Sequence, residues 1–284
     1  MIVRALAVTF AIGTACAEDV SLRSGTVVVE SGTLKLKASL WRPEGSGPHP
    51  AILFNHGSGR ATDTPGGQAD QLNRLREPQI LGPIFAKHGY VFLYLFRRGA
   101  GLSAGQGTAG GDLMEAEAAR HGREGRNRIQ LQLLAVDEMA DAIAGLKFLR
   151  GLPGVDSQRL GVVGHSFGGS LSLLLAEREP SLRAAVEFGG AAGSWESSEA
   201  LQQRLLEAVR ASSVPEFLIH AANDCSIAPA LELGKEMQRL GKAHRVKIYP
   251  ATGARADDGH RFVYLDVPTW EPDVFAFLDE YLKQ

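Results

Sequence analysis

Short apolar runs alternate with longer segments of helical periodicity along almost the whole chain. In chains of this kind each strand is followed by a helix that returns across the sheet, so the strands pair in parallel and helices cover both faces. We therefore predict an α/β fold with a mostly parallel, eight-stranded sheet. The strands are expected near residues 25–30, 33–41, 51–54, 91–96, 160–163, 184–188, 217–220 and 246–249.

The predicted strands differ in the spacing of their apolar residues. The first two flank Ser31-Gly32, and residues 33–41 alternate apolar and polar side chains, which indicates an exposed antiparallel hairpin at the sheet edge. Residues 51–54 and 160–163 are continuous apolar runs. Such runs are typical of central strands that helices cover on both sides.

Outside the strands, apolar residues at three- and four-residue steps predict a helix over 136–149, and a last helix is expected over 274–282. Two segments, 105–125 and 193–213, do not fit the alternation. We interpret both as cap insertions over the edge where the parallel strands end, although solvent-facing decoration explains the first equally well.

Length and charge limit what the chain can do. With 284 residues, 44 % of them hydrophobic, it is expected to form a single domain over 18–284. Thirty Lys plus Arg face 32 Asp plus Glu, which gives a formal charge of −2 and leaves no basic block to neutralise a row of phosphates. We expect no nucleic-acid partner.

The first residues have the order of a secretory signal. Arg4 precedes an apolar run over 5–12, and Ala15-Cys16-Ala17 provides a cleavage site of small residues. An interior strand would explain the apolar run but not the Ala-x-Ala ending. We therefore predict a signal peptide over 1–17 and an exported protein, periplasmic or secreted. The run is too short to span a bilayer, so no stable membrane insertion is expected.

Removal of the signal would leave one cysteine, Cys225, which cannot form an internal disulfide. Alternatively Cys16 is lipid-modified, although Gly13 stands where a lipoprotein signal usually has leucine. One cysteine and no HExxH pair do not make a zinc site of the usual kinds. We predict neither a metal nor an organic cofactor.

The pattern Gly-x-Ser-x-Gly occurs twice, at 164–168 and 101–105. It forms a sharp turn between a strand and a helix that holds a serine hydroxyl clear of the sheet. Ser166 has the predicted strand 160–163 before it and a helical pattern after it, whereas Ser103 has neither. We predict that Ser166 is a nucleophile and that Ser103 lies in a turn.

A serine nucleophile needs a base, which an acid must orient. In this architecture functional groups gather at the carboxyl ends of the strands, in the chain order serine, acid, histidine. Asp224 follows the strand over 217–220, and His260 is the only histidine after the strand over 246–249. We predict a catalytic triad of Ser166, His260 and Asp224.

Other residues compete for these roles. Asp257 and Asp258 are alternatives for the acid, but residues two or three positions from His260 rarely converge on its ring. The histidines within or beside strands are expected to make structural hydrogen bonds: His56, His165 and His220. The remaining histidines are expected to face solvent: His49, His88, His121 and His244.

Nucleophilic attack on an acyl carbon produces an oxyanion, which preorganised N–H donors stabilise. One donor should be the amide of Phe167, next after the nucleophile, and the other should come from the loop over 55–59. We predict the amide of Ser58 as the second donor, with Gly57 and Gly59 as alternatives that also permit the close turn.

With these motifs placed, the chain from about residue 25 onward resembles the α/β-hydrolase superfamily, and within it the dienelactone-hydrolase-like and prolyl-oligopeptidase-like branches. The resemblance is carried by Phe-Asn-His-Gly at 54–57, Arg-Gly-Ala-Gly-Leu-Ser at 98–103, Leu-Pro-Gly-Val-Asp at 152–156, Gly-His-Ser-Phe-Gly-Gly at 164–169, His-Ala-Ala-Asn-Asp at 220–224 and Gly-His at 259–260. It implies the α/β-hydrolase fold and the same triad. Dienelactone hydrolases proper have a cysteine nucleophile where this chain has Ser166.

We therefore expect a serine esterase that hydrolyses small-molecule carboxylic esters through an acyl-enzyme intermediate. A serine peptidase or amidase, a lactonase and a thioesterase are the alternatives on the same fold. A catalytically inactive binding protein is a further alternative, against which the complete triad argues. Trp195 is a candidate for lining the acyl pocket. The sequence specifies neither the substrate nor the oligomeric state.

Overall fold

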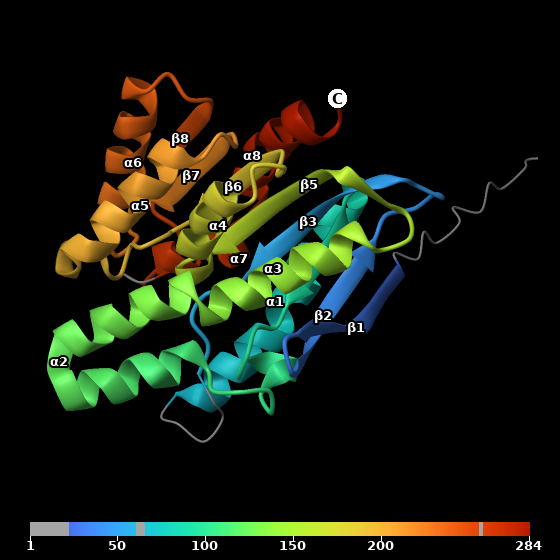
Figure 1. Ribbon diagram of the computed structural model, residues 1–284. Coiled ribbons are helices and arrows are strands. Elements are labelled where there is room, and N and C mark those ends of the chain that lie inside the picture. Colours follow the sequence, from blue (N-terminus) through green and yellow to red (C-terminus); the bar gives the residue numbers. More distant parts are fainter. Residues whose placement is uncertain (1–22, 61–65, 256–257) are drawn as a thin grey trace, which may run out of the picture.

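The computed structural model describes residues 23–60, 66–255 and 258–284 (Figure 1). The predicted signal peptide, 1–17, lies outside the described residues. The chain forms an eight-stranded sheet with the strand order β1-β2-β4-β3-β5-β6-β7-β8. The predicted fold, a mostly parallel sheet covered by helices, is confirmed.

The strands are β1 (Arg23–Ser31), β2 (Leu34–Arg42), β3 (His49–Asn55), β4 (Val91–Leu95), β5 (Val155–His165), β6 (Ala184–Phe188), β7 (Glu216–Ala221) and β8 (His244–Tyr249). β1 pairs antiparallel with β2, and β2 pairs antiparallel with β4. From β4 to β8 all neighbours are parallel. The antiparallel hairpin thus stands at one edge of the sheet, as its alternating sequence predicts.

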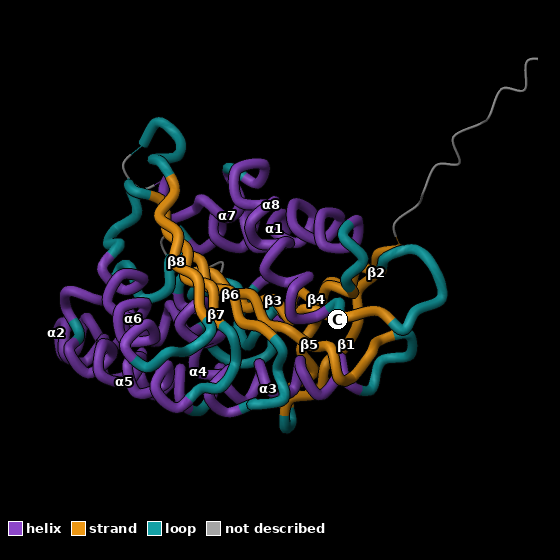
Figure 2. Tube along the Cα trace, turned by 90° about the horizontal axis from the view of Figure 1, so that it is seen from above, coloured by secondary structure: helices purple, strands orange, loops and turns teal. Residues whose placement is uncertain are grey.

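The helices are α1 (Gly67–Lys87), α2 (Gly110–Ala135), α3 (Asp137–Arg150), α4 (Phe167–Arg178), α5 (Glu199–Ala211), α6 (Ala228–Arg239), α7 (Phe262–Leu265) and α8 (Val267–Leu282), with 3-10 turns η1 (Gly101–Ser103), η2 (Trp195–Ser197) and η3 (Asp258–Arg261). Figure 2 shows α1, α7 and α8 on one side of the sheet and α3 to α6 on the other. In the described ranges, no helix has the length and apolar character needed to cross a membrane.

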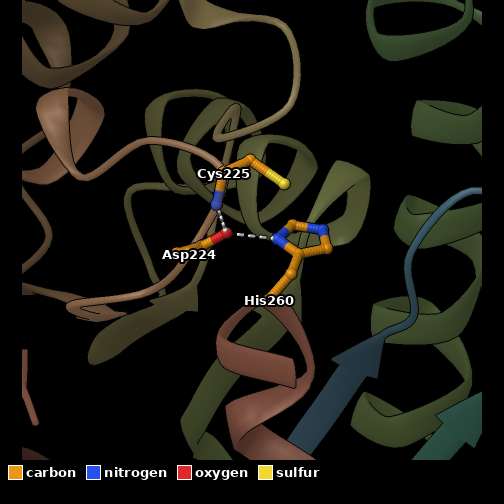
Figure 3. A group of neighbouring side chains, drawn as sticks. All are labelled: Asp224, Cys225 and His260. Carbon is orange, nitrogen blue, oxygen red and sulfur yellow. Dashed lines mark hydrogen bonds and ion pairs between the residues drawn. The ribbon is translucent and has the colours of Figure 1, made fainter. Parts of the chain in front are cut away.

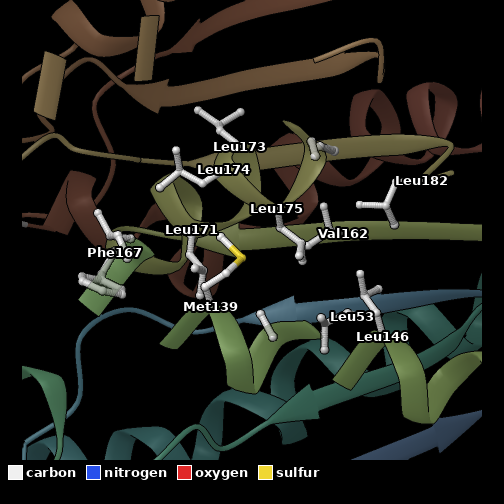
Figure 4. Close-up of a cluster of buried hydrophobic side chains, with 14 of the residues drawn as sticks. Leu53, Met139, Leu146, Val162, Phe167, Leu171, Leu173, Leu174, Leu175 and Leu182 are labelled. Carbon is white, nitrogen blue, oxygen red and sulfur yellow. The ribbon is translucent and has the colours of Figure 1, made fainter. Parts of the chain in front are cut away.

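The core has two halves because the central strands bury both of their faces. Leu53 on β3 packs with Val162 on β5 and Leu146 on α3, as Figure 4 shows. Its neighbours Ile52 and Phe54 point to the opposite face and join the second cluster. All of these side chains are fully buried. Each contributes roughly 1.5–3 kcal/mol of burial free energy, which explains why these strands are apolar at every position.

The segment predicted near 105–125 as an insertion forms most of α2, which continues to Ala135. A break at Gly122, with φ 63° and ψ −155°, divides α2 into two limbs that run side by side in Figure 1. The amide of Gly111 donates to the carbonyl of Gly59 after β3, and Asn127 donates to the carbonyl of Ser197 after β6. These contacts place α2 at the edge where the parallel strands end.

The prediction that residues 193–213 form an insertion is wrong. This segment forms η2 and α5, and α5 packs between α4 and α6 in the helix layer. Its side chains Leu201, Leu205, Ala208 and Val209 are buried in the core. α5 is therefore the regular crossover between β6 and β7, and its polar outer face made it look unlike the other crossovers.

Candidate active site

Ser166 stands at a sharp turn between a strand and a helix. β5 ends at His165 and α4 begins at Phe167, so Ser166 alone makes the turn. Its φ of 57° lies in the left-handed region, which a residue with a side chain adopts only under strain. A Cβ added at Gly168 would collide with the carbonyl oxygen of Asn55 at the end of β3. This close packing explains the glycine at the end of the motif.

His260 connects Ser166 to Asp224. Its Nε2 lies 2.8 Å from Oγ of Ser166, and its Nδ1 lies 2.7 Å from Oδ1 of Asp224. His260 belongs to η3, and Asp224 lies on the loop after β7. The same carboxylate oxygen accepts the backbone N–H of Cys225 at 2.6 Å, as Figure 3 shows. The structure thus brings the residues predicted as nucleophile, base and acid into one hydrogen-bonded chain.

Asp224 is more shielded from solvent than His260. The side chain of Asp224 is 1 % exposed, and that of His260 is 22 % exposed. Burial raises the pKa of Asp224, but hydrogen bonds and charge from His220 and His260 outweigh burial and hold this pKa well below its usual range. Asp224 is therefore a carboxylate. A buried ring N–H of His165 donates to the carbonyl of His260 at 2.6 Å and fixes the backbone of the base.

The second Gly-x-Ser-x-Gly match has no comparable setting. Ser103 ends the three-residue η1, and the next helix begins only at Gly110. The Ser103 side chain is fully buried, and its Oγ accepts the backbone N–H of Lys37 at 2.8 Å. Ser103 therefore satisfies a backbone donor of β2.

The alternative acids differ from Asp224 in their surroundings. The Asp258 carboxylate accepts the backbone N–H groups of Ala254 and Arg255, each at 3.0 Å, and so closes the loop that precedes η3. Asp257 lies outside the described residues. The geometry therefore favours Asp224 over Asp258 as the partner of His260.

The loop after β3, which was predicted to supply an oxyanion donor, lies against Ser166. A Cβ added at Gly57 would be 3.4 Å from Cβ of Ser166. Two guanidinium groups hold this loop by its carbonyls. Arg97 donates to His56 at 2.7 Å and to Gly57 at 3.1 Å, and Arg74 donates to Ser58 at 2.9 Å. The N–H of a trans peptide points opposite to its carbonyl, so the amide of Ser58 points away from Arg97.

Arg97 also contacts the residue that carries the other predicted donor. Its guanidinium carbon lies 5.8 Å from the ring centroid of Phe167. Arg97 is fully buried, and Glu138 on α3 accepts its Nε–H and neutralises its charge. One buried ion pair therefore holds the carbonyl of the Gly57–Ser58 peptide and lies against the ring of Phe167. Ser58 and Phe167 are the two residues predicted to stabilise an oxyanion.

The prediction that Trp195 lines an acyl pocket is wrong. The side chain is buried in the core, and its indole N–H donates to Glu232 on α6 at 3.2 Å. Trp195 begins η2, and its side chain packs in the same buried cluster as Leu201 and Leu205 of α5. Its aromatic character follows from packing, which the sequence alone does not distinguish from ligand contact.

Within the part of the chain that the structure describes, one group of three metal-binding side chains lies together: Asp224, Cys225 and His260 (Figure 3). Their donor atoms are within 4.8 Å of one another. Two of the three already bond to each other through Nδ1 of His260. The closeness of the group therefore follows from the hydrogen bond between the acid and the base.

Sequence reasoning missed three residues that shape the site. Arg97 follows β4 by two positions, at the sheet edge where functional groups collect, and this position could have indicated it. Gly189 directly follows β6, and a Cβ added there would lie 2.8 Å from Oδ2 of Asp224. Glu187 interrupts the apolar run of β6, which is a signal of a buried partner.

Solved structures resemble the chain over most of its length. A dienelactone hydrolase from Anabaena variabilis is 19 % identical, with a TM-score of 0.56, and the match covers 92 % of this chain and 97 % of that one. An esterase from Pyrococcus furiosus is 16 % identical, with a TM-score of 0.62 and coverages of 96 % and 95 %. These likenesses support the fold.

An acylaminoacyl peptidase from Pyrococcus horikoshii is 19 % identical, with a TM-score of 0.62, over 93 % of this chain but only 42 % of the peptidase. The chain thus spans about two fifths of the peptidase's length. Residues 81–267, more than half of the chain, match the dienelactone hydrolase family. Together with its α/β-hydrolase sheet, this match shows that the chain belongs to the dienelactone hydrolase family.

Proposed function

We propose that this protein cleaves carboxylic esters through an acyl-enzyme intermediate on Ser166. The observation that carries the proposal is the hydrogen-bonded chain from Oγ of Ser166 through His260 to Asp224, at a strained turn between strand and helix. A serine hydroxyl is a poor nucleophile unless a base removes its proton, and Nε2 of His260 lies within hydrogen-bonding distance of the hydroxyl.

The reaction then has two halves. Ser166 Oγ attacks the ester carbon while His260 Nε2 takes the hydroxyl proton, and the amides of Phe167 and Ser58 donate to the resulting oxyanion. His260 returns the proton to the leaving alcohol, which leaves an acyl group on Ser166. Water attacks this acyl group, again losing its proton to His260, and Ser166 is restored as the acid product departs. Asp224 stabilises the imidazolium that forms in each half.

The share of each similar structure that the chain covers favours ester substrates over peptides. The dienelactone hydrolase and the esterase are matched over almost their full length, and both are named for ester or lactone cleavage. The peptidase is matched over less than half of its length. A peptidase or amidase is the second candidate because peptide cleavage uses the same acyl transfer.

A substrate screen distinguishes the two candidates. We expect p-nitrophenyl esters of graded acyl length to be cleaved and matched p-nitroanilides to release no chromophore, because a peptidase must also cleave the less reactive anilide bond. The measurement is initial rates of chromophore release by purified protein. Cleavage of the anilides would assign the protein to the peptidase class.

Gly189 offers a test of the site's packing. It has φ 64°, and a Cβ at this position would press on Asp224 and lie 3.3 Å from Nδ1 of His260. We expect Gly189→Ala to lower kcat on the order of 100-fold by displacing the acid from the base. Gly193→Ala is the matched control, because a Cβ there meets nothing within 4 Å. Equal rates for the two variants, both folded, would contradict the described geometry.

A further inference from the structure

A second histidine, His220, lies next to Asp224 on the side away from His260. Oδ1 of Asp224 faces His260 at 2.7 Å, and its other oxygen, Oδ2, lies 3.0 Å from Nδ1 of His220. His220 is on β7, and its side chain is fully buried. The Asp224 carboxylate is therefore held between two histidines, of which only His260 reaches Ser166.

The outer nitrogen of His220 meets a second carboxylate. Nε2 of His220 lies 3.6 Å from Oε1 of Glu187 on the neighbouring strand β6. Glu187 pairs with Leu218 in the parallel register, so its side chain shares a sheet face with His220, two residues farther along β7. The other oxygen of Glu187 accepts the backbone N–H of Gly190 at 2.5 Å. Both strands thus contribute to one buried row of charged groups.

The charges in this row must balance because they are shielded from water. Asp224 and Glu187 are each 1 % exposed, and two buried carboxylates without a cation would be strongly destabilising. Burial lowers the pKa of His220, but the charge of Glu187 and contacts with both carboxylates outweigh burial and raise the pKa to about 9. His220 is therefore an imidazolium at neutral pH.

This arrangement leaves the acid with its full charge. The imidazolium of His220 and the carboxylate of Glu187 cancel each other, so the net negative charge of the row is that of one carboxylate. Asp224 can then stabilise a positive charge on His260 during the reaction. Without Glu187, the charge of His220 would oppose that stabilisation.

We propose that His220 and Glu187 are positioning residues of the active site, with His220 holding Oδ2 of Asp224 and Glu187 balancing the charge of His220. The inference rests on the proposed function, because it assumes that Asp224 acts through His260. The pair fixes the carboxylate rotation that presents Oδ1 to Nδ1 of His260. It also keeps Asp224 ionised at acid pH by placing a positive charge 3.0 Å from its second oxygen.

Two substitutions of His220 test whether its role is the contact with Asp224 or only side-chain packing. The amide nitrogen of an asparagine can occupy the place of Nδ1, whereas that of a glutamine can occupy the place of Nε2. His220→Asn therefore preserves a donor to Asp224, and His220→Gln preserves only a donor to Glu187. Both variants lose the positive charge of His220. We expect His220→Gln to lower kcat on the order of 100-fold with little change in KM, and His220→Asn, which keeps a group beside Oδ2 of Asp224, to recover part of the loss.

The pH profile gives a second readout. In the described chain, the charged groups that interact with His220 are Glu187 from β6 and Asp224 from the following loop; Glu216, on the same strand, interacts with Glu187, and His260 lies beyond Asp224. Loss of the positive charge of His220, in either variant, makes the pair of Asp224 and His260 easier to protonate. The acid limb of the kcat profile should therefore move to higher pH in both variants, and farther in His220→Gln, which also loses the contact with Oδ2.

Glu216→Gln is the matched control for altering a buried acid in this region. Glu216 is fully buried at the start of β7, and burial raises its pKa to about 8, so it is mostly neutral at pH 7. A neutral glutamine should leave kcat unchanged, whereas Glu187→Gln should lower it several-fold. Glu187→Gln also tests the proposal if both His220 variants fail to fold.

Combining His220→Gln with Asp224→Asn tests whether His220 acts through Asp224. If His220 acts through Asp224, His220→Gln should have little further effect in the Asp224→Asn background. A full additional loss in that background, or equal loss in His220→Gln and His220→Asn with intact circular dichroism, would overturn the positioning role. An Asp224→Asn variant with normal kcat would instead overturn the proposed function itself.

Discussion

Ser166→Ala is expected to abolish ester cleavage, with kcat falling on the order of a million-fold, as expected for loss of a nucleophile whose partners act as a unit with it. The variant retains the strained turn and the oxyanion donors but has no oxygen to form the acyl-enzyme. Only the slow attack of water assisted by the remaining groups would persist. The measurement is single-substrate kinetics on the fastest p-nitrophenyl ester.

Ser103→Ala is the matched control, because Ser103 occupies the other Gly-x-Ser-x-Gly sequence. Its hydroxyl accepts the backbone N–H of Lys37, so its removal should lower the free energy of unfolding by about 1 kcal/mol without changing kcat. Comparable loss of activity in both variants, with both folded, would remove the basis for assigning Ser166 as nucleophile.

Asp224→Asn is expected to lower kcat on the order of ten-thousand-fold while the fold is preserved. An amide at this position favours the wrong tautomer of His260 and cannot stabilise the imidazolium. The substitution also removes the carboxylate that the Cys225 amide and the two histidines surround. Circular dichroism and the same ester assay measure the two parts of the prediction.

Asp258→Asn is the control for this change, since Asp258 is close to His260 in sequence but bonds to the amides of Ala254 and Arg255. We expect its kcat to stay within a few-fold of the original, because the substitution weakens only a contact within the loop. If Asp258→Asn or Asp257→Asn proved far more damaging than Asp224→Asn, the loop before His260 would supply the acid.

The site residues that the sequence could indicate are those fixed by local structure. Ser166 follows a continuous apolar strand and precedes a helix, and the glycine at 168 is required by a close backbone contact. Asp224 and His260 each follow a parallel strand, and in a parallel sheet all such loops emerge at one edge. Their convergence is therefore a consequence of strand order.

Contacts that depend on register or on helix packing were not predictable in this way. The pairing of His220 with Glu187 requires β6 and β7 to be neighbours in a particular register, which no single segment specifies. Trp195 looked like a pocket residue because an aromatic side chain after a glycine-rich loop suits either a core or a ligand site. The many charged residues of α5 likewise made its apolar face, which includes the buried Leu205, difficult to recognise in the sequence.

The most direct test of the central claim is to locate the residue that a fluorophosphonate modifies. Trypsin cleaves after arginine, so Ser166 is released in the peptide over 160–178 and Ser103 in the peptide over 99–120. The proposed mechanism predicts one phosphonyl group per chain, on Ser166, with a labelling rate that falls sharply in Asp224→Asn. Labelling of another residue, or an unmodified Ser166 in protein that has lost its esterase activity to the reagent, would contradict it.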